Sequence, residues 1–118
     1  MDIGGAKTAL MGRLMDATAI RHDVLTHNLA NQNTPGFRRK TVQFETLLQD
    51  AQLRGDEAAA GIVPEVVEDH LTPTGPDGNN VNLELEHNAI RENELLFNTY
   101  AAIMRSNFDL MQSAIKSR

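Results

Sequence analysis

The chain has 118 residues, enough for one ordinary domain, and its aromatic residues are only four Phe and one Tyr. Such a small supply of bulky side chains is poor for a globular core, whereas Leu, Ile, Met and Ala can line a narrow seam between helices. The absence of Cys excludes a disulfide framework and a thiolate metal site. The composition therefore favours a helical bundle or coiled coil over a sandwich of sheets.

The net charge of −5 hides an uneven distribution of charge along the chain. Residues 1–44 contain six Lys or Arg against three Asp or Glu, residues 45–94 two against twelve, and residues 95–118 three against one. The basic residues are too sparse for a nucleic-acid site. No apolar run approaches the roughly 20 residues that cross a bilayer, and no basic stretch followed by an apolar one opens the chain. We therefore expect no nucleic-acid partner, no membrane insertion and no cleaved signal peptide.

Residues 6–31 contain good helix formers and no Pro, which predicts a long N-terminal helix. Its residues fall into two neighbouring rows with spacings of 3 and 4: Met11, Met15, Thr18, His22, Leu25 and Leu29, and beside them Leu10, Leu14, Ala17, Arg21, Val24 and Asn28. Two rows predict two packing partners and favour a helix buried between copies of the chain. A single wide stripe facing one core remains an equally good interpretation.

A turn motif ends this helix. It consists of Asn28, Leu29, Ala30, Asn31, Gln32, Asn33, Thr34, Pro35, Gly36 and Phe37. Pro35 fixes its own φ and Gly36 can adopt a positive φ, so the pair suits the central positions of a type II turn. Asn31 and Asn33 tolerate left-handed backbone. The helix is therefore predicted to end near Ala30 or Asn31.

Residues 32–81 predict a loop-rich middle segment. Residues 37–48 form an extended arm leading into a short helical turn, and its basic run at 38–40 is interpreted as solvated. Residues 50–61 suit frayed helix or loop, and residues 62–67 are an edge strand at best because Pro64 interrupts them. Residues 71–80 are rich in Pro, Gly and Asn and predict a loop.

Residues 82–118 predict a second long helix, since Asn82 suits an N-cap and no Pro or Gly follows. Glu84 and Glu86 lie in its first turn, where the helix dipole favours anions. The seams between the two long helices are predicted to contain Leu14, Leu25, Leu96, Phe97, Tyr100, Ile103, Met104 and Met111. Asn93 and Asn107 fall on the same stripe, where they either fix the register of packing or face solvent.

The predicted fold class is mainly α. Residues 1–118 form a single unit, in which the helices at 6–31 and 82–118 make an antiparallel, coiled-coil-like hairpin joined by the extended middle segment.

The chain lacks a recognisable chemical site. His22 and His27 are five positions apart, about 140° around a helix, so they do not share a face. The stretch that starts at Asp77 begins like a calcium loop, but Asn82 and Asn88 stand where Gly and Glu are required. We expect no catalytic residue, no cofactor and no metal, and therefore no enzyme.

The turn motif at residues 28–37 resembles the signature near the N-terminus of the bacterial flagellar axial proteins, the rod, hook and hook-associated family. A second stretch, Asp77, Gly78, Asn79, Asn80, Val81 and Asn82, resembles the segment that opens the C-terminal helix in a proximal rod member. The similarity runs in order over most of the chain except residues 51–75. Departures are Asn82 in place of Asp, and His87 and Asn88 after Glu86 where an apolar residue commonly follows.

This resemblance implies a structural subunit of the proximal rod that polymerises through its terminal helices for motility, with the middle segment bridging subunits. It implies export through the flagellar type III apparatus without a cleaved signal peptide, and a final place in the periplasm-spanning basal body. The implied partners are other copies of the chain, other rod proteins, and basal-body ring and export-gate components. The alternatives are another rod subunit, or a soluble helical adaptor that binds a partner helix.

Overall fold

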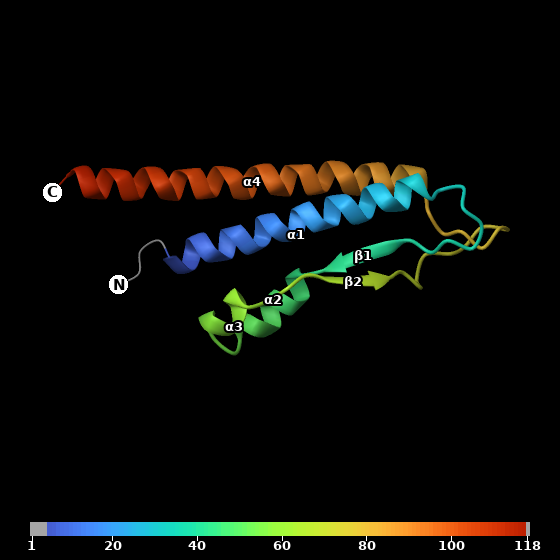
Figure 1. The fold of residues 1–118 in the computed structure, drawn as a ribbon, viewed down its shortest axis with the longest axis horizontal. Helices are drawn as coiled ribbons and strands as arrows, with labels where there is room; N and C mark the ends of the chain where they lie inside the picture. The colour runs from blue at the N-terminus through green and yellow to red at the C-terminus, as the bar shows by residue number, and fades with distance from the viewer. Residues whose placement is uncertain (1–4, 118) are drawn as a thin grey trace.

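Two long helices run antiparallel along the molecule and are joined by a small folded middle segment (Figure 1). The structure is a computed structural model that describes residues 5–117, and the molecule measures 67 × 28 × 14 Å. Helix α1 spans Gly5–Ala30 and helix α4 spans Leu83–Lys116. The predicted fold class, mainly α with two long terminal helices, is confirmed.

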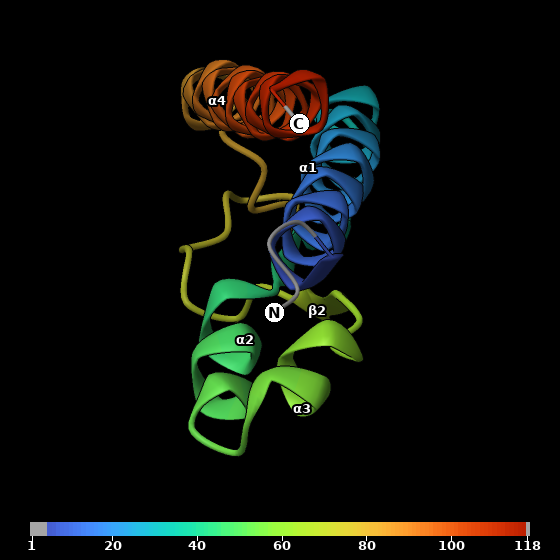
Figure 2. The same cartoon turned by 90° about the vertical axis from the view of Figure 1, so that its left-hand side faces the viewer.

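The ends of both helices follow the local sequence. Helix α1 stops at Ala30, immediately before the turns of residues 31–36. Helix α4 begins after Asn82, whose side-chain oxygen accepts a hydrogen bond from the backbone N–H of Leu85 at 3.2 Å. The two helices are close together at this end of the molecule and diverge toward the opposite end (Figures 1 and 2). No helix in the described part of the chain has the length and apolarity to cross a bilayer.

The middle segment forms a third layer on the side of α1 away from α4 (Figure 2). Its elements are β1 (Lys40–Gln43), α2 (Glu45–Gln52), α3 (Asp56–Ala60) and β2 (Glu65–Glu68). The strands pair antiparallel, with Lys40 opposite Glu68 and Gln43 opposite Glu65. The arm, the short helix after it and the edge strand thus lie close to where the sequence predicts them, and most of residues 50–61, for which helix and loop were both left open, is helical.

The small apolar core lies between α1 and the middle segment. Phe44 is fully buried at its centre, and it shares a cluster with Leu14, Ala17, Leu48, Ala51 and Ala59. A two-stranded sheet is marginal by itself, so packing on α1 is what stabilises this layer.

This core corrects the interpretation of the two rows on α1. Leu14 and Ala17 face the middle segment, while Thr18, from the neighbouring row, is buried and its carbonyl oxygen accepts a hydrogen bond from Asn93 of α4. Both packing partners of α1 therefore belong to the same chain, and its two rows need no second copy. The sequence left the second partner open, because it predicted residues 45–61 only as a short helical turn, able to pack on α1 or on a neighbouring copy, followed by frayed helix or loop.

The predicted seam residues divide into two groups. Leu14 and Leu25 are buried, and partial burial applies to Leu96, Tyr100, Met104 and Met111. Ile103 is 40% exposed, which corrects its assignment to a buried seam, and Phe97, also 40% exposed, lines a groove between α1 and α4 without being buried there. One helix that diverges from α4 cannot cover the whole apolar stripe.

We predict that Phe44→Ala lowers the free energy of unfolding by about 3–5 kcal/mol, because it removes the central side chain of the core. Leu110→Ala is the matched control, since Leu110 is 67% exposed on α4. Chemical denaturation of both variants measures the difference. Equal losses of stability would show that the core is not centred on Phe44.

Candidate functional site

The two motifs found in the sequence bind each other directly, and we call this contact between residues 31–39 and 77–80 the motif junction. The backbone N–H of Gly36 donates to the carbonyl oxygen of Asp77 at 2.8 Å. The Asn79 side chain donates to the carbonyl oxygens of Asn31 and Thr34, both at 2.8 Å. Residues 77–80, which precede α4, thus provide hydrogen-bond partners for backbone groups at and just after the end of α1.

Asn80 continues the junction on the other side of the turn. Its backbone N–H donates to the carbonyl oxygen of Phe37 at 3.3 Å, and its side-chain oxygen accepts the N–H of Arg39 at 2.6 Å. Its side-chain amide also donates to the carbonyl oxygen of Asp69. Asn79 and Asn80 are 6% and 2% exposed, so these bonds pair amides that are shielded from water.

The turn has the geometry that the sequence predicts. Phe37 donates its N–H to the carbonyl oxygen of Thr34 at 3.2 Å, and Gly36 has φ +74°. Gly78 faces it with φ +80°, and a Cβ on Gly78 would lie 3.4 Å from the Cα of Gly36. Both residues thus adopt a φ that favours glycine, and the two backbones pass close to each other at Gly78.

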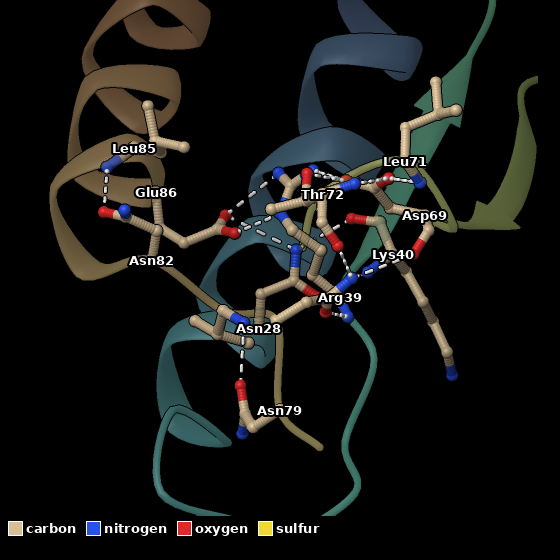
Figure 3. A network of polar contacts seen from close by, with 12 residues as sticks. Asn28, Arg39, Lys40, Asp69, Leu71, Thr72, Asn79, Asn82, Leu85 and Glu86 are labelled. Atoms are coloured by element: carbon tan, nitrogen blue, oxygen red, sulfur yellow. Dashed lines mark hydrogen bonds and ion pairs between the residues drawn. The ribbon is translucent and has the colours of Figure 1, made fainter. Parts of the chain in front are cut away.

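A buried ionic network lies beside the junction (Figure 3). Glu86, in the first turn of α4, is fully buried and forms an ion pair with Arg39. The Arg39 guanidinium also contacts Asp69 at 2.7 Å, just after β2. One arginine thus connects the start of α4 to both ends of the middle segment.

Asn28 connects α1 to the same network. Its side chain donates to the carbonyl oxygen of Lys40 at 2.7 Å and accepts the N–H of Lys40 at 2.8 Å. These are the two hydrogen bonds that a residue of a neighbouring antiparallel strand would form with Lys40. It also donates to Glu86 at 3.4 Å. Asn28 is fully buried, so α1, β1 and α4 meet at this amide.

The electrostatics of the network favour the ionised forms. The pKa of Asp69 lies well below its usual range because its carboxylate accepts a hydrogen bond from the Thr72 hydroxyl and, despite its burial, further ones from Arg39 and two backbone N–H groups. Burial by itself would lower the pKa of Arg39. The hydrogen bonds to Glu86 and Asp69 outweigh this effect, and the pKa of Arg39 is raised.

Within the described residues, the side chains of the remaining motif residues form no hydrogen bond across the junction, and the Asp77 carboxylate accepts only the N–H of nearby Asn79 at 3.1 Å. Phe37 packs against His27, with ring centroids 5.7 Å apart. Leu29 and Val81 are half-buried, and the side chains of Ala30, Asn33, Pro35 and Asp77 are exposed. Gly36 is also exposed, and nothing lies within 4 Å of the position that a Cβ would take there.

The sequence reasoning missed the ionic network. Arg39 belongs to a run interpreted as solvated, and Glu86 was assigned only a favourable interaction with the helix dipole, whereas the two form a buried ion pair. A signal was present, since Glu86, Asn93 and Tyr100 follow one another at intervals of seven on the stripe that faces α1. A carboxylate on such a stripe indicates a buried cation that pairs with it. Asp69 carried no comparable signal.

Asn93 lies in the seam between α1 and α4. It is 3% exposed, and its side-chain amide donates to the carbonyl oxygen of Thr18 at 2.7 Å. Its Oδ1 has no hydrogen-bond partner in the described residues. Of the two interpretations of this residue, the buried one is confirmed at Asn93, while Asn107 is only partly buried.

The arrangement has the properties of a structural joint. Its contacts join one segment of the chain to another, through backbone groups, buried side-chain amides and the guanidinium of Arg39. Within the described residues, no group of three His, Cys, Asp or Glu side chains has the geometry to bind a metal ion. The junction fixes the direction in which α4 leaves α1.

We predict opposite effects for two glycine substitutions. Gly36→Ala should lower the free energy of unfolding by about 1–2 kcal/mol, because its φ of +74° disfavours an L-residue although space for a methyl group is available. Gly12→Ala, inside α1 and also without a neighbour, should raise it by about 0.5–1 kcal/mol. Denaturant titration distinguishes the two, and a stabilised Gly36→Ala variant would contradict the turn geometry.

We predict that the stabilising effect of Asp69 disappears in acid. Because its folded-state pKa is depressed, its contribution is fully present above the unfolded pKa, about 3.9, and is lost as pH falls through the folded value. The difference in stability between wild type and Asp69→Asn should therefore be constant above about pH 5 and shrink below about pH 4. Stability curves at several pH values test this, and a difference that persists at the lowest pH would contradict it.

Comparisons with known proteins agree with this geometry. Residues 9–38, which cover most of α1 and the turn, match the sequence model of a family described as flagella basal body rod protein. The chain is 27% identical to the flagellar basal body rod protein FlgB of Borrelia hermsii, over 98% of this chain and 100% of that protein. It is 24% identical to FlgB of Borreliella burgdorferi over 88% of this chain and 91% of that protein, and 29% identical to FlgB of Aeromonas hydrophila over 81% and 82%. The similarity thus spans both motifs of the junction, and the chain is similar over most of its length to flagellar basal body rod proteins.

Proposed function

We propose that this chain is a structural subunit of the proximal rod of the flagellar basal body, and that it polymerises through its terminal helices. The similarity to flagellar basal body rod proteins supports the structural role in the basal body. The observation that carries the mode of assembly is the large amount of apolar surface that α4 leaves uncovered.

Six large apolar side chains in the second part of α4 are exposed: Leu95, Phe97, Ile103, Phe108, Leu110 and Ile115. Helix α1 and the middle segment leave this part of α4 open on more than one side (Figure 2). Large exposed apolar patches on a soluble chain mark surfaces that bind other proteins. Assembly with further subunits is a direct way to remove them from water.

The motif junction supports the proposal from the other end of the molecule. A subunit that polymerises through two helices must present them at a fixed angle, and buried polar contacts fix such a register. Arg39, Glu86 and Asn28 hold the end of α1 and the start of α4 together. The exposed part of α4 then projects from a rigid base.

The proposal includes the partners and the route that the family resemblance implies. The partners are other copies of the chain and other rod proteins, together with ring and export-gate components of the basal body. The route is export through the flagellar type III apparatus without a cleaved signal peptide. The role is mechanical, and the junction contains no arrangement suited to catalysis.

We predict that Leu110→Ala and Ile115→Ala leave the melting temperature of the purified protein unchanged but abolish swarming and incorporation into basal bodies. These side chains are 67% and 69% exposed, so their truncation removes surface that only assembly buries. Gln112→Ala is the matched control, an exposed polar residue on the same stretch of helix, and should preserve swarming.

Two outcomes would count against the rod mechanism. Normal swarming of both variants would show that this part of α4 is not an assembly surface. A lower melting temperature together with intact swarming would favour the soluble helical adaptor.

A further inference from the structure

One face of α4 carries charges in a self-complementary order. It contains Arg91, Glu94, Asn98, Ala101, Arg105 and Asp109, spaced by three or four residues, and we call it the charged face. Glu94 and Arg105 are eleven residues apart, about three helical turns, so they point in nearly the same direction. The order of signs along the face is positive, negative, positive, negative.

The charged residues of this face form no ion pair with another described residue, and Arg91 donates only a hydrogen bond to the Asn88 side chain at 3.4 Å. All four are exposed on α4. The ion pairs of the described residues are formed by Arg21, Arg38 and Arg39, and neither Arg91 nor Arg105 takes part in one. The face is therefore free to pair with charges outside the chain.

The order of signs fits a twofold axis near residues 99 and 100. Glu94 and Arg105 lie about equally far from this point on either side, and so do Arg91 and Asp109. If two α4 helices lie antiparallel across such an axis, each glutamate meets the other copy's arginine. Parallel helices without an axial shift would instead place like charges opposite each other.

Apolar contacts support the same pairing. Phe97, 40% exposed, lies in a groove of about 420 Å³ between α1 and α4, which Glu94, Asn98 and Asp23 also line. An antiparallel partner would place its small residues Ala101 and Ala102 over Phe97, where the helices can approach closely. Asp23 adds a second carboxylate near the arginine that meets Glu94.

We propose that the charged face of α4 binds the same face of a second copy of this chain, antiparallel about this twofold axis. This closed pairing goes beyond rod polymerisation and does not depend on it. Leu110 and Ile103 lie on a different flank of α4 and stay uncovered. The pairing can be measured on the purified chain, so its failure would leave the rod assignment untouched.

Charge reversal tests the pairing by sedimentation equilibrium. Glu94→Arg or Arg105→Glu alone should raise the dimer dissociation constant about tenfold or more, since each reversal places like charges together at two symmetric positions. The double variant, with both changes in one chain, should recover much of the affinity because the axis exchanges the partners. A wild-type chain that stays monomeric at all concentrations, or a double variant weaker than both single ones, would overturn the proposal.

Cross-linking tests the direction of the helices, because the chain has no Cys. Ala101→Cys lies close to the axis and should cross-link to itself with a short bismaleimide. Gln112→Cys is the matched control, since two such residues in an antiparallel pair would be roughly 37 Å apart along the helices at 1.5 Å per residue. Equal cross-linking at both positions would indicate parallel helices and overturn the proposal.

Discussion

The buried ion pair between Arg39 and Glu86 is the constraint on which the arrangement of this molecule depends. Glu86 is fully buried, and a buried carboxylate that loses its cation costs several kcal/mol. The first turn of α4 must therefore stay beside the arginine that precedes β1. Asp69 holds the same guanidinium from the end of β2, and Asn28 ties Glu86 and the backbone of Lys40 to α1. The directions of the two long helices and of the middle segment follow from these few contacts.

Polar and apolar contacts contribute to this fold in different ways. The apolar core, centred on Phe44, fixes the middle segment to one side of α1. At the other side of α1, near the motif junction, buried amides and carboxylates define how α4 lies, and Asn93 even leaves one oxygen unpaired. Polar contacts of this kind favour one register over its neighbours more than they add stability. The result is a chain that is well fixed at one end and leaves much of α4 open at the other.

This division suits a subunit that completes its packing in an assembly. The open part of α4 offers two distinct surfaces, the charged face with Glu94 and Arg105, and the uncharged flank with Ile103 and Leu110. A charged surface selects a partner and its orientation, whereas an apolar surface supplies most of the free energy of association. The motif junction keeps both surfaces at a fixed angle to the rest of the subunit.

The sequence by itself determined the two long helices, the turn and the N-cap, because each depends on local chemistry: the Pro and Gly of the turn, the side chain of Asn82, and periodic apolar residues. It also identified both motifs as important through their resemblance to the rod family. Only the tertiary structure decided that the motifs bind each other, that Arg39 and Glu86 are buried together, and that the middle segment covers one side of α1. These facts depend on contacts between residues more than 20 positions apart, such as Arg39 with Glu86, Asn31 with Asn79, and Arg21 with Glu45. Local sequence patterns cannot specify which distant groups meet, because the residues next to an arginine in the sequence do not show whether its side chain is exposed or buried.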